Sequence, residues 1–250
     1  MIVNAHAHIG ESRVFDHDFP EQALMDGMDK YEIDVSIVQP LIGPKSYREY
    51  HDAIADAAAR YPGRIVGMTA FSPHIDRDDY FAEVERCVKE LGFVGIKLHP
   101  FEMGIDPLSE DGRVAFEAAS AFDVPLMVHT GTGAPFASPA KLIPRAREFP
   151  HLPIIMAHAG LIVYTHEAMI AAEICQNLYF EPSWCSYYLV GEMIEKFGSE
   201  RVMIGGDHIL NYPLEKLKID LLELNDEDRD NVLGETARRV FKLDERMSKP

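Results

Sequence analysis

The chain has 250 residues, 47% of them hydrophobic, and a formal net charge of −17 at pH 7. A chain of this length can bury a full hydrophobic core, so we expect one domain spanning residues 1–250. The acidic balance, without any lysine- or arginine-rich cluster, argues against a nucleic-acid partner, and no apolar stretch is long enough to span a bilayer.

The three cysteines, Cys87, Cys175 and Cys185, are odd in number and show no C-x-x-C spacing. This argues against both a disulfide framework and a structural zinc knuckle. The first residues also lack the basic segment that opens a secretory signal. We therefore expect a soluble protein of the cytoplasm.

Short apolar segments alternate with segments of helical period along the chain. We expect eight strands, at residues 2–8, 35–39, 65–70, 94–98, 125–129, 153–158, 178–181 and 202–206. Helices are expected at residues 21–31, 50–60, 77–91, 112–121, 166–176, 190–197 and 214–224, with an extra C-terminal helix at 227–241. A strand followed by a helix, repeated eight times, predicts an α/β protein of the (β/α)8 TIM-barrel class.

Two histidines, His6 and His8, end the first expected strand. Residues two apart on a strand point to the same face, so the two imidazoles should converge. Converging imidazole nitrogens form half of a site for a divalent metal such as zinc, which takes three or four protein ligands. The other ligands should come from the ends of neighbouring strands.

Four further expected strands end in, or run into, a side chain that can bind metal or move a proton. These side chains are Lys97 and His99 on the fourth strand, His129 on the fifth, His158 on the sixth and Asp207 after the eighth. In a TIM barrel the active site lies at the carboxyl ends of the strands. Their gathering at these ends therefore predicts a catalytic site there.

In this order the motifs resemble the amidohydrolase superfamily, and more closely its amidohydrolase-related branch, amidohydrolase 2, of metal-dependent TIM-barrel hydrolases and decarboxylases. The motifs are H-x-H on the first strand, Gly-Ile-Lys-Leu-His-Pro at 95–100, single histidines ending the fifth and sixth strands, and an aspartate after the eighth. The resemblance implies that one divalent metal, most often Zn²⁺ in this branch, is held by four ligands. These ligands would be His6, His8, His129 and Asp207.

The resemblance also places His158 beside a metal-bound water and leaves Lys97 two roles. Relatives with two metals carry a carbamylated lysine at the end of strand four, and the histidines of strands five and six then bind the second ion. We favour the one-metal site, with Lys97, His99 and His158 as second-metal or substrate-binding residues in the other case. Asn4 stands where many relatives have an acidic residue, so a carboxylate that would support a ligand is missing there.

Two reactions fit these residues. In the first, a metal-dependent hydrolase of a small amide, lactone or ester, Asp207 takes the proton of the water and His158 orients the developing charge. The alternative is a lyase, a non-oxidative decarboxylase or hydratase of an unsaturated or aromatic carboxylic acid. A decarboxylase should gather basic side chains to hold a carboxylate, and only Lys97 and Arg13 qualify, so we favour hydrolysis. We expect a small-molecule substrate and a homodimer.

Four other histidines, His17, His51, His151 and His166, fall in expected loops or helix starts, where a solvated histidine is ordinary. We assign none of them a role. Trp184, just beyond the seventh expected strand, lies where it could form an apolar wall of the pocket.

Overall fold

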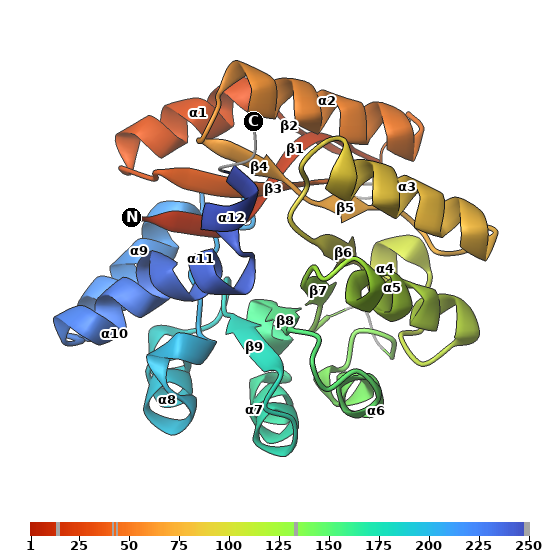
Figure 1. The fold of residues 1–250 in the computed structure, drawn as a ribbon. Helices are drawn as coiled ribbons and strands as arrows, with labels where there is room; N and C mark the ends of the chain where they lie inside the picture. Colours follow the sequence, from red (N-terminus) through yellow and green to blue (C-terminus); the bar gives the residue numbers. More distant parts are fainter. Residues whose placement is uncertain (14–15, 42, 44, 133–134, 248–250) are drawn as a thin grey trace.

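The computed structural model describes residues 1–13, 16–41, 43, 45–132 and 135–247. Parallel strands form the wall of a barrel, and helices surround it (Figure 1). The strands of this wall are β1 Val3–Ser12, β3 Val35–Pro40, β4 Ile65–Gly67, β5 Thr69–Ala70, β6 Ile96–Leu98, β7 Leu126–His129, β8 Ile154–Ala157 and β9 Leu178–Glu181. The expected TIM barrel is confirmed, with β4 and β5 together forming its third strand.

The eighth strand expected at 202–206 is an extended segment that bonds to both neighbours without a continuous ladder. Met203 N–H donates to Phe180 O at 2.9 Å on one side, and Ala5 N–H donates to Ile204 O at 3.0 Å on the other. Isolated bridges join the segment to β9 at Val202 and to β1 at Asp207. The barrel therefore closes between its last and first strands.

Helices cover the outside of the barrel. They are α1 Glu21–Lys30, α2 Tyr47–Arg60, α3 Arg77–Lys89, α5 Glu110–Ala121, α6 Leu142–Glu148, α7 Thr165–Ile174, α8 Tyr187–Phe197 and α9 Tyr212–Leu221. No helix was expected at the position of α6. Pro144 is the third residue of α6, a first-turn position that tolerates proline.

Shorter elements complete the fold. They are β2 His17–Phe19, α4 Pro100–Met103, the 3₁₀ turns η1 Pro139–Lys141, η2 His158–Gly160 and η3 Ser199–Arg201, then α10 Asp226–Asp230, the π-helical turn η4 Asn231–Glu235, α11 Thr236–Val240 and α12 Leu243–Met247. Strand β2 pairs antiparallel with the end of β1. The segment from α10 to α11 is the extra C-terminal helix that the sequence predicts. None of the helices in the described part of the chain combines the length and the hydrophobicity that a membrane-spanning segment requires.

A β-bulge in β1 changes which of its side chains face the barrel interior. The register with β3 shifts between Asn4 and Ala7. Val3, before the shift, and Ala5, within it, pack in the apolar cluster inside the barrel, whereas Ala7, beyond it, packs in the outer cluster. Because a bulge reverses the alternation of a strand, His6 and His8 face the interior above Ala5.

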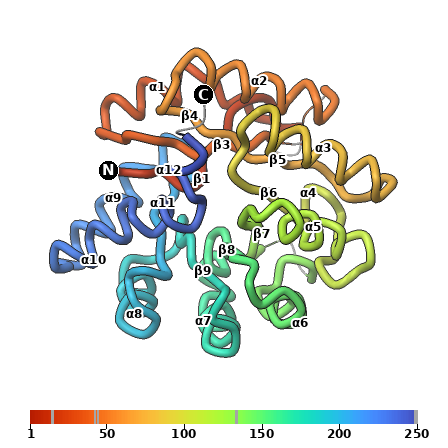
Figure 2. The backbone as a smooth tube through the Cα atoms, in the orientation of Figure 1, coloured from red at the N-terminus to blue at the C-terminus, as the bar shows by residue number. Residues whose placement is uncertain are grey.

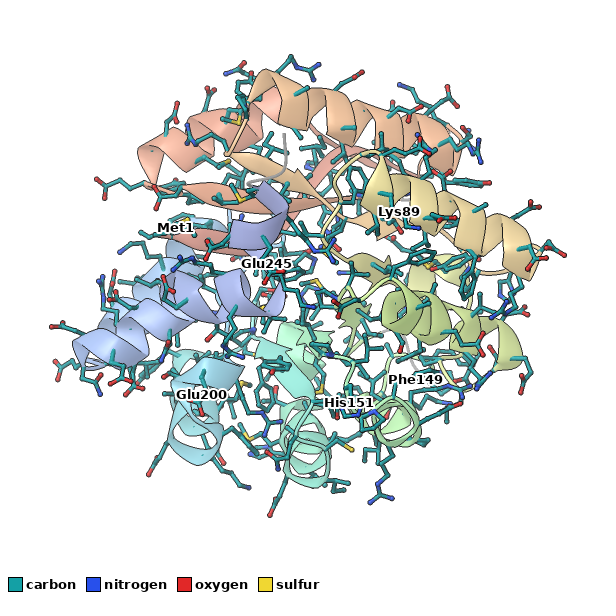
Figure 3. The ribbon with its side chains drawn as sticks, viewed as in Figure 1. Met1, Lys89, Phe149, His151, Glu200 and Glu245 are labelled. Carbon is teal, nitrogen blue, oxygen red and sulfur yellow. The ribbon has the colours of Figure 1, made fainter. Side chains whose placement is uncertain are left out.

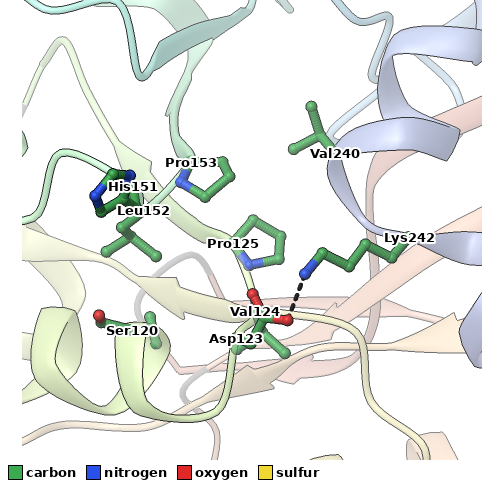
Figure 4. A pocket seen from close by; sticks show the side chains of 10 residues that line it. Ser120, Asp123, Val124, Pro125, His151, Leu152, Pro153, Val240 and Lys242 are labelled. Carbon is green, nitrogen blue, oxygen red and sulfur yellow. Dashed lines mark hydrogen bonds and ion pairs between the residues drawn. The ribbon is translucent and has the colours of Figure 1, made fainter.

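The amino end of the barrel is closed by the C-terminal helices. Val240 and Phe241 join strand residues such as Val35 and Met127 in the inner apolar cluster. Figures 1 and 2 show α11 and α12 crossing this end, close to the N-terminus. A cavity of about 160 Å³ lies beside them, where Lys242 pairs with Asp123 (Figure 4). The carboxyl ends of the strands remain as the open end.

One expectation about the histidines is wrong, because His51 is fully buried. Its Nε2 accepts from Ala70 N–H at 3.2 Å, so Nδ1 carries the proton and lies 2.8 Å from Glu83 Oε1. Arg86 also donates to Glu83, with its Nη2 2.7 Å from Oε1. This buried ion-pair cluster ties α2 and α3 to the third strand.

Replacing Glu83 should therefore destabilise the fold. Glu83→Ala leaves the N–H of His51 buried without an acceptor, and we expect a loss of about 3 kcal/mol in the free energy of unfolding, measured by urea titration. The control is Glu85→Ala, which removes an exposed helical pair with Lys89 and should change the value by less than about 0.5 kcal/mol. Equal effects of the two changes would contradict the structural role of Glu83.

The same cluster predicts a pH dependence of stability. Burial alone would raise the pKa of Glu83, but hydrogen bonds from His51 and Arg86 outweigh it and lower the pKa from 4.5 to about 2. A lowered carboxyl pKa stabilises the fold above the unfolded value, and that stabilisation is lost as pH falls from about 4.5 toward 2. The difference in unfolding free energy between wild type and Glu83→Gln should shrink over this interval. A difference in unfolding free energy that stays constant with pH would contradict the stabilisation by ionised Glu83.

Candidate metal centre

Three side chains converge at the open end of the barrel. The Nε2 atoms of His6 and His8 lie 3.2 Å apart, and each lies 3.3 Å from Asp207 Oδ1. The two histidines come from β1, and Asp207 follows the eighth strand. The structure thus brings together three of the four residues that the family resemblance names as metal ligands.

Hydrogen bonds at the far side of each ring fix which nitrogen faces the centre. His6 Nδ1 lies 2.6 Å from Glu181 Oε2, and His8 Nδ1 lies 3.2 Å from the carbonyl oxygen of Gln39. Both partners are acceptors, so the Nδ1 atoms carry the protons and the Nε2 lone pairs point inward.

Three acceptor atoms in mutual contact repel one another unless a proton or a cation lies between them. Two imidazole nitrogens and a carboxylate oxygen are donors that zinc, manganese and related divalent ions accept. The residues present therefore fit a divalent metal.

Lys97 competes for the same lone pair. Its buried Nζ lies 2.9 Å from His6 Nε2. Burial lowers the pKa of Lys97 to about 8, although the carboxylates of Asp207 and Glu181 partly offset this. One nitrogen lone pair cannot accept a proton from Lys97 and bind a cation together. A metal at this centre requires Lys97 to release His6.

His158 supplies a further imidazole from the end of the sixth strand, where it opens η2. Its Nδ1 lies 2.8 Å from the hydroxyl oxygen of Ser183, which donates in turn to Glu181 Oε2 at 3.1 Å. The His158 and His6 rings lie 5.0 Å apart between centroids. Burial holds the pKa of His158 well below 6.5, so the ring is neutral at pH 7 with Nε2 free to accept.

His129 lies beside this group without joining the three converging atoms. Its ring is 4.9 Å from the ring of His158, and its Nε2 donates to the carbonyl of Thr132 at 3.0 Å. Its Nδ1 is buried with no hydrogen-bond partner among the described residues. Burial lowers the pKa of His129 to about 4. A ligand role for His129 stays a prediction, and the bare Nδ1 is the atom that would serve.

His99 stacks on His129, with ring centroids 4.0 Å apart. Its Nδ1 accepts from Glu102 N–H at 3.2 Å and so caps helix α4. Burial holds the pKa of His99 well below 6.5. His99 is therefore neutral at pH 7 and supports the His129 ring by stacking.

Sequence reasoning missed Glu181 and the polar role of Trp184. Glu181 is fully buried at the end of β9, and a charged residue closing an otherwise apolar strand was the available signal. Burial alone would raise the pKa of Asp207, but attraction to the imidazoles of His158 and His6 outweighs it and holds the pKa well below 3.8. Trp184 donates its indole N–H to the other oxygen of Asp207, Oδ2, at 2.8 Å.

The remaining histidines lie outside the centre. His151 is exposed in the turn before β8 (Figure 3), and His166 is exposed on α7. His17 is also exposed, but it lies in β2 rather than in a loop, with its Nε2 3.3 Å from His208 Nε2. Of the four histidines expected to be solvated, only His51 is buried.

Comparison with known proteins agrees with this fold. A family model described as amidohydrolase matches residues 3–243. The 2-keto-4-carboxy-3-hexenedioate hydratase of Sphingobium sp. is 27% identical over 260 residues, covering 82% of this chain and 75% of that protein. The gamma-resorcylate decarboxylase of Polaromonas sp. is 35% identical over 95 residues, covering 33% of this chain and 27% of that protein.

Among solved structures, a dihydroxybenzoic acid decarboxylase from Polaromonas sp. JS666, with bound manganese and the inhibitor 2-nitroresorcinol, superposes with a TM-score of 0.79. The two sequences are 18% identical, and the match covers 99% of each chain. At this identity the likeness supports the barrel fold. With the family match spanning nearly its whole length, the chain belongs to the amidohydrolase family.

Proposed function

We propose that this protein is a divalent-metal-dependent lyase acting on a small unsaturated carboxylic acid, and that its reaction is the addition or removal of water. The convergence of three acceptor atoms beside a neutral imidazole supports the proposal, because these groups could hold a metal and supply a base side by side. Hydrolysis, which the sequence favoured, has less support than the lyase alternative, since the relative that covers most of the chain is a hydratase.

Decarboxylation is the second candidate. It is supported by the 35% identity to a gamma-resorcylate decarboxylase over 95 residues and by the barrel shared with a dihydroxybenzoic acid decarboxylase. The shorter match with the decarboxylase and the lack of a basic cluster place it behind hydration.

His6, His8 and Asp207 would hold one ion, with His129 Nδ1 as a fourth ligand. The donor set suits zinc or manganese, so manganese joins zinc as an expected ion. When bound, a divalent cation supplies Lewis acidity that polarises a substrate oxygen and makes water more acidic. A single ion fits better than two as long as Lys97 is not carbamylated, because its ammonium group repels a second cation.

Two side chains would carry out the remaining steps. His158 Nε2 accepts a proton from the attacking water and returns it to the adjacent carbon of the double bond. We assign this role to His158 rather than Asp207, because both oxygens of Asp207 are engaged. Lys97, once it releases His6, offers its ammonium to the substrate carboxylate. The ring of His158 is already oriented by Ser183.

The test combines metal analysis with lyase assays on conjugated unsaturated acids, followed by loss of ultraviolet absorbance, and with measurement of released carbon dioxide. We expect one ion per chain, lost in His6→Ala. His158→Ala should keep the ion and lower kcat by about 100-fold or more. Release of carbon dioxide without hydration would favour the second candidate. Turnover of lactones or esters alone would return the assignment to hydrolysis.

Glu181 provides an independent prediction about the metal. Glu181→Gln weakens the acceptor that holds His6 Nδ1, so the affinity for Mn²⁺ should fall by about 10- to 100-fold, measured by calorimetric titration of metal-free protein. Glu192→Gln, an exposed change on α8, is the control and should leave the affinity unchanged. Equal affinities of wild type and Glu181→Gln would show that His6 is not oriented through this carboxylate.

A further inference from the structure

Asp207 uses its two carboxylate oxygens differently. Oδ1 faces the Nε2 atoms of His6 and His8, whereas Oδ2 accepts the indole N–H of Trp184 at 2.8 Å. Trp184 is the only tryptophan of the chain. Its side chain is 44% exposed, so the bond forms at the mouth of the site.

The backbone holds Trp184 in a conformation that non-glycine residues seldom adopt. Its φ is +67°, and that of Asp207 is +59°. Such conformations persist only where the surroundings fix them. Here the buried carboxylate of Glu215 fixes both the loop of Trp184 and the loop of Asp207. Glu215 Oε1 accepts from Trp184 N–H at 2.9 Å and from Asn211 Nδ2 at 2.9 Å.

Asn211 connects Glu215 to the loop that carries Asp207. Its Nδ2 also donates to the carbonyl oxygen of Gly206 at 3.2 Å. Glu215 therefore fixes the main chain of Trp184 directly and the residue before Asp207 through Asn211. Hydrogen bonds from Glu215 on α9 therefore hold the Trp184 indole opposite the Asp207 carboxylate.

We propose that Trp184 is a positioning residue for Asp207, an inference that rests on the proposed metal site. Its N–H keeps Oδ2 turned away from the centre, so that Asp207 presents Oδ1 alone. A carboxylate that is free to rotate must be ordered when the ion binds, and it therefore binds the ion more weakly than one whose orientation is already fixed. Trp184 thus fixes Oδ1 of Asp207 as the ligand atom before an ion arrives.

The test compares Trp184→Phe with Tyr187→Phe in Mn²⁺ titrations, in which electron paramagnetic resonance measures the free ion. Trp184→Phe keeps an aromatic ring and removes the N–H, and it should weaken Mn²⁺ binding by about 10- to 100-fold. Tyr187→Phe also removes one donor from an exposed aromatic residue, on α8, and should bind as wild type does. Equal affinity of wild type and folded Trp184→Phe would overturn the inference and leave the metal site standing.

A second measurement needs no variant. Because Trp184 is the only tryptophan, its emission reports on this bond directly. Paramagnetic Mn²⁺ bound by Asp207 should quench that emission in the wild-type protein, with a midpoint equal to the binding constant. Mn²⁺ binding without quenching would place the indole elsewhere and overturn the inference. A wild-type chain that binds no Mn²⁺ would overturn the metal site itself.

Discussion

The geometry of the site depends on one buried carboxylate, that of Glu181. Its Oε2 lies 2.6 Å from His6 Nδ1 and accepts from the His158 main-chain N–H at 3.3 Å and from the Ser183 hydroxyl at 3.1 Å. Its Oε1 accepts from the Ser183 main-chain N–H at 2.9 Å. A fully buried charge needs several donors, and these supply them. Through these bonds one side chain fixes the free nitrogen of His6 directly and that of His158 through Ser183. Two imidazoles from different strands are thereby oriented before any ligand enters.

Glu181 reaches His6 because the strand between them carries glycine. A Cβ at Gly205 would lie 2.5 Å from Glu181 Oε1 and 2.7 Å from His6 Cβ, so no larger residue leaves room for this contact. The same segment is tied to β1 by Asn4 Oδ1, which accepts from Gly206 N–H at 2.8 Å, and by Asp207 N–H, which donates to His6 O at 2.8 Å. Closure of the barrel thus places Asp207 beside two histidines about two hundred positions earlier in the chain.

Sequence patterns predicted the barrel and most of the candidate metal centre, because both follow from the order of strands and helices along the chain and from the residues at the strand ends. The alternation of strands and helices set the fold, and strand ends singled out His6, His8 and Asp207. The supporting carboxylate could not be placed in this way. The sequence suggested that it was missing at Asn4, but Glu181 provides it from β9, which only the 202–206 segment separates from β1, a contact that depends on tertiary geometry. The bulge in β1 and the burial of His51 depend on packing in the same way.

If the proposed function holds, the position of Lys97 couples metal binding to substrate binding. Lys97 Nζ contacts the His6 nitrogen that a metal would take, so the ion and the ammonium exclude each other at that atom. On the proposed function, an ion bound by His6 would displace the lysine hydrogen bond, and the freed ammonium would need an anionic partner in its buried surroundings. The carboxylate of the substrate can provide that partner. A site with few basic residues could therefore still bind an organic acid, because metal binding would release the cation that the acid requires.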